Sequence, residues 1–471
     1  MRDAERLSGS TLTRTYSILL YAIGFLWFGI LVSWVSGDYT LFPDSPGYEV
    51  SQGFPISFVG DSLRAWPTPL LYSLSDSFRI QTLFQAVAYG ASWTAVIWVF
   101  LRRMNWRPAS LAALALVALA LTPLYLQWTM TILSEATTLS LVLFGFAGAQ
   151  AFIQRVEAVT GRVSLTLVLG AASLSAFGLA AVSRLTLVIL LVPIGLVLST
   201  TAWRRRERAL TGVLVSLLIV IVSYTVWVNA RIDEHWGVSR TATYYGYLTA
   251  SETRLQSVLA DPLFEYMTEL GPECLAQHRA SFEGIKAPDP YQLRGYLAGE
   301  CPAGVEWLEG NFQVQYAKYI IMHPSYASRY LLTYLPQVTD AGGYGGITSV
   351  LPIPVANLYS SAVDVDHDYR PVYFWLALWF CTSLVAIQFL WRRKGVGCDL
   401  YVPLIASAAS VVVMLATVLT TNLEEARVAS QASALLFASV IVMLAALSAV
   451  RGRGTFTQAG PGNGNSEEAV G

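Results

Sequence analysis

The sequence predicts an all-α polytopic membrane protein with about ten transmembrane helices, cytoplasmic N and C termini and a mainly helical extracytoplasmic domain. The composition is 54% hydrophobic and only 13% charged over 471 residues, which is too apolar for a soluble chain of this length. Uncharged runs of about 20 residues, the length that crosses a bilayer, recur along the chain. The charges cluster between these runs, and a net charge of −1 gives no reason to expect a nucleic-acid partner.

The apolar runs give ten candidate spans. They lie at 16–36, 81–101, 109–130, 136–153, 163–183, 185–202, 209–230, 372–391, 400–421 and 428–450. The first is too long for a signal-peptide core and lacks a cleavage site, so it is expected to be a retained helix. The stretches 109–153 and 163–202 are each interrupted by a single charge, Glu135 and Arg184, and each is expected to form a hairpin with that charge at its tip.

The arginines predict the orientation, because positive residues favour the cytoplasmic side of short loops. Most of them fall in segments that lie on one side if the N-terminus is inside: 2–14, 102–107, 155–162, 204–208, 392–394 and 451–453. The opposite short loops hold only Arg64, Arg79, Arg184 and Arg427. An even number of spans also places the C-terminus inside.

This topology divides the chain into four parts. They are an N-terminal bundle at 1–230 with spans 1–7 and an acidic first outer loop at 37–80, an extracytoplasmic domain at 231–371, the last three spans at 372–450, and a disordered cytoplasmic tail at 451–471. Within the second part, apolar residues recur with helical spacing at 253–270 and 311–335. This part also contains Cys274 and Cys301, which either form a disulfide or remain free thiols.

Charged residues gather on the predicted outer face. A charge in the middle of a membrane costs several kcal/mol, so Glu135, Arg184 and Arg427 are expected at an interface or in a polar cavity, on the side of Asp44. Simpler interpretations remain open. Glu135 and Arg184 could be solvated turn charges or pair with each other, Arg427 could pair with the nearby Glu424, and Asp44 could be only a turn residue of "PDSPG".

Motifs of several enzyme classes are absent. No P-loop, GxSxG, HExxH or CxxC occurs, which excludes the common ATP-driven, serine-hydrolase and zinc-protease classes. The stretch "DVDHDYR" at 364–370 has ligand types that suit a divalent cation, but it fits a solvated approach to the membrane equally well. The sequence establishes no cofactor, and a divalent cation is the one it leaves open.

Five stretches together resemble the membrane-embedded glycosyltransferases of the GT-C superfamily, such as the protein mannosyltransferase and aminoarabinose transferase-like families. The acidic motif that opens the first outer loop is "FPDSPGYEV", and "RAWPTPLLYSL" is similar to the Pro-rich stretch before the second helix. "TPLYLQWTMTILSEATTLSLVLF", "AVSRLTLVILLVPIGLVL" and "IIMHPSYASRYL" resemble the Ser-Glu, Arg and His-Pro segments. Many relatives carry Asp-Glu where this chain has Asp44 and Ser45.

The resemblance implies a reaction and a set of roles. Such enzymes move a sugar from a polyprenyl-phosphate carrier to a glycan, lipid or protein acceptor on the outer side of the plasma membrane, in the synthesis of cell-envelope glycans or glycoconjugates. Asp44 is then the general base, while Arg184 and Arg427 hold the donor phosphate. Glu135 orients an arginine or binds sugar hydroxyls.

The resemblance also assigns aromatic and basic residues of the first outer loop to the substrate. Tyr48, Arg64 and Trp66 would contact or orient it, and Tyr72 is of the same kind, although aromatic residues also form belts at membrane interfaces. Attack opposite the phosphate would invert the anomeric configuration.

Two other functions remain. A transporter or flippase of a lipid-linked envelope precursor predicts buried charges along the middle of the spans, whereas here most charges lie at the ends. A non-catalytic membrane scaffold would be favoured if Asp44, Glu135 and Arg184 lay far apart or faced lipid.

Overall fold

The protein is all-helical in the part that its computed structural model describes. That part comprises residues 2–37, 39, 41, 56–59, 64–158, 163–236, 262–277, 299–336, 370–392, 398–420 and 425–454. Within it, nine helices are long and apolar enough to cross a membrane, and a bent pair raises the number to ten if it counts as one span. The prediction of an all-α, multi-span membrane protein is therefore confirmed.

The bundle helices follow the predicted runs closely. The N-terminal ones are α1 (Arg2–Ser36), α2 (Pro67–Tyr72), α3 (Phe78–Leu101), α4 (Trp106–Ala120), α5 (Pro123–Leu126), η3 (Gln127–Met130), α6 (Glu135–Glu157), α7 (Val163–Ser183), η4 (Leu185–Leu187), α8 (Val188–Arg204) and α9 (Arg208–Trp236). The C-terminal ones are α17 (Arg370–Arg392), α18 (Cys398–Thr420) and α19 (Glu425–Gly454). Thus α19 runs past the predicted start of the tail at 451, and residues 455–471 lie outside the described residues.

One predicted span is not a continuous helix. The run 109–130 is divided into α4 and a second piece, α5 with η3, which bend by 56° relative to each other. Pro123 explains the break, because proline lacks the backbone N–H and disfavours a helical conformation of the preceding Thr122. The carbonyl of Ala120, freed at the end of α4, accepts a hydrogen bond from Tyr89 Oη at 2.6 Å.

The centre of the bundle is formed by α6 and α19, and 78% of the most apolar window of each helix is buried. Helix α6 packs against α3, α7, α18 and α19. Small residues let the helices approach closely: a Cβ atom on Gly145 of α6 would lie 2.6 Å from the ring of Phe177 in α7. Nearby, Ser173 of α7 donates a hydrogen bond to the Gly145 carbonyl at 2.8 Å.

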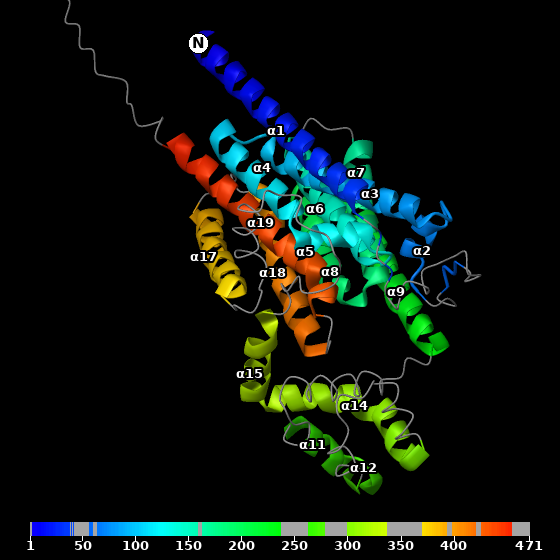
Figure 1. Ribbon diagram of the computed structural model, residues 1–471. Coiled ribbons are helices and arrows are strands. Elements are labelled where there is room, and N and C mark those ends of the chain that lie inside the picture. Colours follow the sequence, from blue (N-terminus) through cyan, green and yellow to red (C-terminus); the bar gives the residue numbers. More distant parts are fainter. Residues whose placement is uncertain are drawn as a thin grey trace, which may run out of the picture.

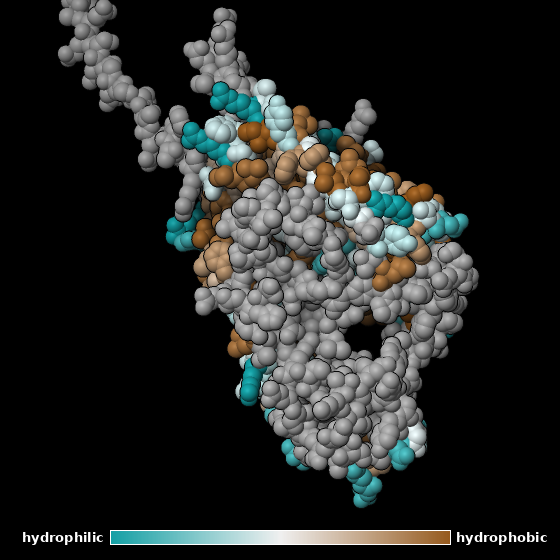
Figure 2. Space-filling model, viewed as in Figure 1, coloured by the Kyte–Doolittle hydropathy of each residue, from teal (hydrophilic) through white to brown (hydrophobic). Residues whose placement is uncertain are grey.

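The outer surfaces of the peripheral helices are apolar. Only 22% of the most apolar window is buried in α9 and in α17, and 33% in α1. Large apolar side chains such as Phe28 of α1, Ile219 of α9 and Phe380 of α17 are exposed. Figure 2 shows apolar residues over much of the visible, described surface of the bundle. Such surfaces are expected where helices face lipid.

The remaining helices form a small unit at one end of the bundle. These are α11 (Pro262–Leu270), α12 (Glu273–Gln277), α14 (Pro302–Met322) and α15 (Pro324–Tyr334). Figure 1 shows α11, α12 and α14 at the end opposite to the start of α1 and the last turns of α19. Two tyrosine hydroxyls join this unit to the bundle: Tyr316 donates to the Leu419 carbonyl at 2.5 Å, and Tyr373 to the Leu332 carbonyl at 2.6 Å.

A polar contact joins three helices near the other end of the bundle. The carboxylate of Asp399, in the first turn of α18, accepts hydrogen bonds from Gln150 at 2.8 Å and from Gln154 at 3.2 Å, both in α6. Arg102, which follows α3, donates to the Gln154 side-chain oxygen at 3.3 Å. These bonds satisfy polar groups that would be costly to bury alone.

Candidate functional site

Glu135 and Arg184, the two charges that interrupt the apolar stretches, form an ion pair. Glu135 is the first residue of α6, and Arg184 lies in extended backbone between α7 and η4. Arg184 Nη2 donates to Glu135 Oε1 and, at 3.4 Å, to the Ser134 hydroxyl. The side chain of Glu135 is 0% exposed and that of Arg184 is 18% exposed. Glu135 is therefore a buried carboxylate paired with a cation that reaches the protein surface.

The guanidinium group of Arg184 keeps one donor uncommitted. Its Nε atom is buried and has no hydrogen-bond partner among the residues that the structure describes. A buried N–H group without a partner is uncommon in native proteins and often marks a place for water or a ligand. Guanidinium N–H groups bind phosphate and carboxylate oxygens well, so this atom suits an anionic ligand.

The chain just before Glu135 is held by side chains from other elements. The Leu133 carbonyl accepts a hydrogen bond from Tyr72 Oη at 2.8 Å and another from Gln85 Nε2 at 3.0 Å. Gln85 Nε2 also contacts Tyr72 Oη. The surrounding stretch from 127 to 140 is buried throughout, although many of its residues are polar. Within it residues 131–134 are not helical, and non-helical backbone is tolerated in a membrane bundle only when protein or a polar cavity surrounds it.

The backbone before Arg184 is held in a similar way by α9. Asn229 Nδ2 donates to the carbonyl of Val182 at 3.3 Å and to that of Thr225, in its own helix, at 2.9 Å. The Arg184 backbone N–H donates a hydrogen bond to the Ala180 carbonyl at 2.9 Å and so completes the last turn of α7. Both members of the ion pair therefore follow segments whose carbonyl groups are fixed by neighbouring helices.

The end of α1 is capped by an arginine from α3. Arg79 donates to the carbonyls of Trp34, of Val35 at 3.2 Å and of Gly37 at 2.5 Å. Its guanidinium carbon also lies 4.4 Å from the centre of the Trp34 ring. A cation at a helix C-terminus is favoured by the helix dipole and satisfies carbonyls that have no helical partner. Arg79 thus fixes the end of α1, where the predicted first outer loop begins.

Part of the first outer loop is tied to α9. Trp66 Nε1 donates to Tyr224 Oη at 2.9 Å, and Tyr224 Oη donates to the carbonyl of Phe58 at 2.7 Å. The rings of Phe58 and Trp66 are 4.8 Å apart. Arg64 precedes α2 and is half-buried. Tyr72 is 1% exposed, so it belongs to the interior and not to an interface belt.

Several predicted site residues lie outside the described residues. These are Asp44 and Tyr48 of the first loop, and the acidic stretch 364–369. Arg427 has its backbone in the first turn of α19, but its side chain is not described. The catalytic and second phosphate-binding assignments therefore remain predictions. Among the described residues, no group of three or more His, Cys, Asp or Glu side chains could hold a metal ion.

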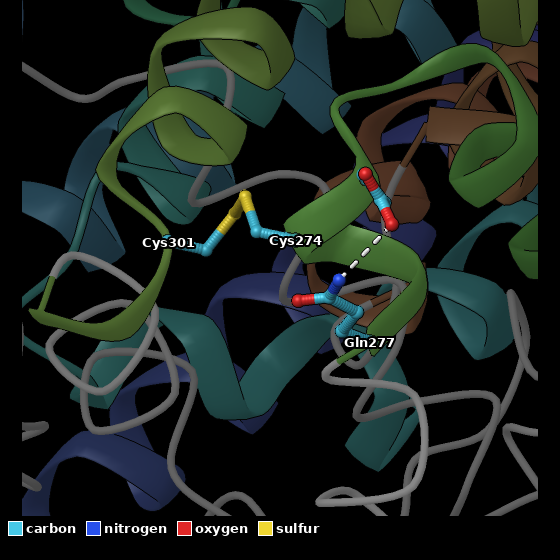
Figure 3. Close-up of a disulfide and its surroundings, with 4 residues drawn as sticks. Cys274, Gln277 and Cys301 are labelled. Carbon is cyan, nitrogen blue, oxygen red and sulfur yellow. Dashed lines mark hydrogen bonds between the residues drawn. A yellow bond between two sulfur atoms is a disulfide. The ribbon is translucent and has the colours of Figure 1, made fainter.

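Cys274 and Cys301 are joined by a disulfide, with their Cα atoms 5.6 Å apart (Figure 3). The bond links α12 to the residue before α14. In the same view Gln277 donates to a carboxylate oxygen of Glu273 at 3.2 Å, a contact within α12. Disulfides persist in oxidising compartments, which agrees with the predicted outer position of this unit.

The supporting roles of the residues around the pair were not predicted from the sequence, which placed Tyr72 at the substrate or in an interface belt. Tyr72, Gln85 and Asn229 each hold a backbone carbonyl near Glu135 or Arg184, and Arg79 was counted only as a loop charge. One signal was present: Gln81 and Gln85 are spaced i, i+4, so they share one face of the otherwise apolar α3. Polar residues inside a membrane span usually face the bundle interior.

Comparison with known proteins gives one similarity. No family model matches the chain, and no curated protein matches it either. Among solved structures, the chain is similar to the crystal structure of ArnT from Cupriavidus metallidurans bound to undecaprenyl phosphate, with 19% identity and a TM-score of 0.30. The alignment covers 92% of this chain and 77% of that chain. At this identity and TM-score the similarity assigns no function, and the case for one is made from the residues themselves.

Proposed function

We propose that the protein is a membrane glycosyltransferase of the GT-C type, which transfers a sugar from a polyprenyl-phosphate donor to an acceptor on the outer side of the membrane. The observation that carries the proposal is the Glu135–Arg184 pair. It joins a fully buried carboxylate to an arginine that is partly exposed and retains an uncommitted Nε–H group. This is the arrangement expected for a preorganised phosphate-binding cation.

The pair explains how a phosphate would be held. Glu135 fixes one edge of the guanidinium through Nη2, so Arg184 loses little conformational freedom when it binds an anion. The Nε–H group can then donate to a phosphate oxygen. As the bond between the sugar and the phosphate breaks, negative charge grows on the leaving phosphate, and a fixed cation beside it stabilises the transition state.

The other roles in this proposal fall on Asp44, Tyr48 and Arg427, whose side chains are not described, and on Arg64 and Trp66. Asp44 takes the proton of the acceptor hydroxyl as general base, a role typically worth about 10² to 10⁴ in rate. Arg427 is the second phosphate-binding cation, and Tyr48, Arg64 and Trp66 contact the sugar or acceptor. Direct attack on the face opposite the phosphate inverts the anomeric carbon.

The domain assignment follows from the same proposal. Residues 231–371 form the extracytoplasmic domain, and the disulfide within it supports an oxidising, outer location. The segments 1–230 and 372–450 form the membrane bundle of an enzyme in the plasma membrane. Residues 451–471 are its cytoplasmic tail.

The test is sugar transfer in membranes that contain the overproduced protein, with a panel of polyprenyl-phosphate-linked sugars as donors. Arg184→Ala should raise the donor concentration needed for half-maximal rate, and Asp44→Asn should lower the maximal rate. Arg103→Ala, at an exposed arginine of a short loop near the other end of the bundle, is the matched control and should leave both unchanged. If both variants retain wild-type transfer, the proposed roles are wrong.

The same assay separates the proposal from its alternatives. A flippase would move a fluorescent lipid-linked precursor between leaflets of proteoliposomes and transfer no sugar. A scaffold would do neither. Either result would replace the glycosyltransferase assignment.

A further inference from the structure

The short helix α2 makes contacts that lead toward both members of the ion pair. It packs against α3 on one side and against α7 on another, and α7 ends at Ser183, immediately before Arg184. Its last residue, Tyr72, donates to the Leu133 carbonyl at 2.8 Å, just before Ser134 and Glu135. Helix α2 therefore contacts the turn before Glu135 and the helix that precedes Arg184.

The Leu133 carbonyl depends on these side-chain donors. Residues 131–134 are not helical, and the Leu133 N–H bonds only to the nearby Thr131 carbonyl at 2.9 Å. Tyr72 and Gln85 supply the donors to the Leu133 carbonyl, and all three residues are at most 1% exposed. Because a buried carbonyl needs a donor, these two side chains determine where this turn lies.

The other end of α2 is anchored in the first outer loop. Trp66, which directly precedes the helix, donates to Tyr224 of α9, whose hydroxyl in turn donates to the Phe58 carbonyl. The helix has Pro67 and Pro69 in its first turn, where proline stabilises the helical start. A short, stiff element thus runs from the loop segment around Phe58 to the turn before Glu135.

We propose that Tyr72 and Gln85 are positioning residues for the phosphate site, an inference that rests on the proposed function. They hold the Leu133 carbonyl, and through it they set Glu135 against Arg184. Since Glu135 fixes the guanidinium group, a shift of this turn reorients the Arg184 Nε–H group. Helix α2 thereby links the arrangement of the first outer loop to the affinity for the donor phosphate.

Tyr72→Phe tests this with the removal of one hydroxyl group. The chain offers a matched control in Tyr89→Phe, because Tyr89 is also buried and its hydroxyl also donates to a backbone carbonyl at a helix break, that of Ala120. Both variants lose one buried tyrosine hydroxyl and should lower the thermal unfolding midpoint by similar amounts. Only Tyr72 is connected to the ion pair.

The first readout is binding of undecaprenyl phosphate to the purified full-length protein in detergent. Tyr72→Phe should weaken binding by about three- to tenfold, the effect of one lost hydrogen bond, while Tyr89→Phe stays within about twofold of wild type. Equal effects of the two variants would overturn the inference. If Tyr72→Phe does not fold, Gln85→Leu replaces it, with the same expected loss of affinity.

The second readout needs no ligand. Glu135→Gln is combined with each tyrosine variant, and the shifts of the thermal unfolding midpoint are compared with the sum of the single shifts. The Tyr72→Phe pair should deviate from additivity, and the Tyr89→Phe pair should be additive. If the wild type does not bind undecaprenyl phosphate, the proposed phosphate site is wrong. The thermal unfolding cycle still decides whether Tyr72 positions Glu135. Additive shifts for both pairs would refute the link between Tyr72 and Glu135.

Discussion

Removal of the Arg184 side chain should destabilise the protein far more than neutralisation of Glu135. In Arg184→Met the carboxylate of Glu135, which is 0% exposed, loses its cation. Breaking a buried ion pair in this way costs about 3–5 kcal/mol of unfolding free energy. In Glu135→Gln the arginine is 18% exposed and can reach water, and the new amide keeps the shape of the carboxylate. The expected cost is then about 1–2 kcal/mol.

The double variant Glu135→Gln, Arg184→Met should recover most of the loss. No buried charge remains in it, so its cost should be close to that of Glu135→Gln alone. The interaction energy in this double-mutant cycle should therefore be about 3–5 kcal/mol in magnitude, the cost of Arg184→Met alone. An isolated exposed pair would give a value near zero. The asymmetry between the two single variants follows directly from their unequal burial.

Denaturant titration of the purified protein in mixed micelles, followed by tryptophan fluorescence, measures these free energies. The matched control is Arg103→Met, an exposed arginine at which the same substitution should change stability by less than about 0.5 kcal/mol. The reasoning is refuted if Arg184→Met is as stable as wild type, or if the losses of the two single variants simply add in the double variant.

Three further predictions concern the packing around the site. Cys274→Ser opens a disulfide with a sequence separation of 27, which the loop-entropy model predicts to stabilise the fold by about 3.5 kcal/mol. Limited proteolysis should therefore cleave the segment 262–336 sooner than in the wild type, while the bundle stays intact. An unchanged cleavage pattern would contradict this prediction. Arg79→Gln weakens the cap of α1, which should lower the unfolding free energy by about 1–3 kcal/mol and speed amide hydrogen exchange at the end of α1. Unchanged exchange there would show that the cap is dispensable. Gly145→Val should lower the unfolding free energy by about 1–3 kcal/mol because the new side chain would clash with Phe177. In the control Gly212→Ala the added Cβ atom has no neighbour within 4 Å, so stability should not fall. Equal midpoints of the two variants in thermal unfolding would argue against the close packing at Gly145.

The membrane spans could be predicted from the sequence because each must satisfy its own backbone hydrogen bonds in lipid. The run 109–130 is the exception, because it was predicted as one span and is broken at Pro123. Pro193 and Pro403 lie inside the continuous helices α8 and α18, yet Pro123 stands at a break. Tertiary contacts distinguish the break at Pro123. Tyr89 of α3 donates to the freed Ala120 carbonyl, and Tyr125 donates to Ser433 of α19 at 3.0 Å. Partners so distant in sequence leave no local pattern.

The candidate site was only partly predictable. Glu135 and Arg184 could be singled out because a charge within an apolar stretch is costly and therefore informative. Their direct contact depends on how α6 and α7 meet, which hydropathy does not encode. The supporting roles of Tyr72, Gln85 and Asn229 were missed because each acts on a backbone carbonyl, and a carbonyl has no signature in the sequence. Asp44, Tyr48, Arg427 and the disordered tail stay predictions.

The central position of α19 has a consequence for biogenesis. A chain that emerges from the ribosome N-terminus first makes α18 and α19 after all other spans, yet α6 needs both for its packing. Until α18 arrives, Gln150 and Gln154 of α6 lack their partner Asp399, and until α19 arrives Tyr125 lacks Ser433. The early helices must therefore wait in the membrane without these polar partners. Helix α19, which is made after the other described spans, thus completes the core of the bundle.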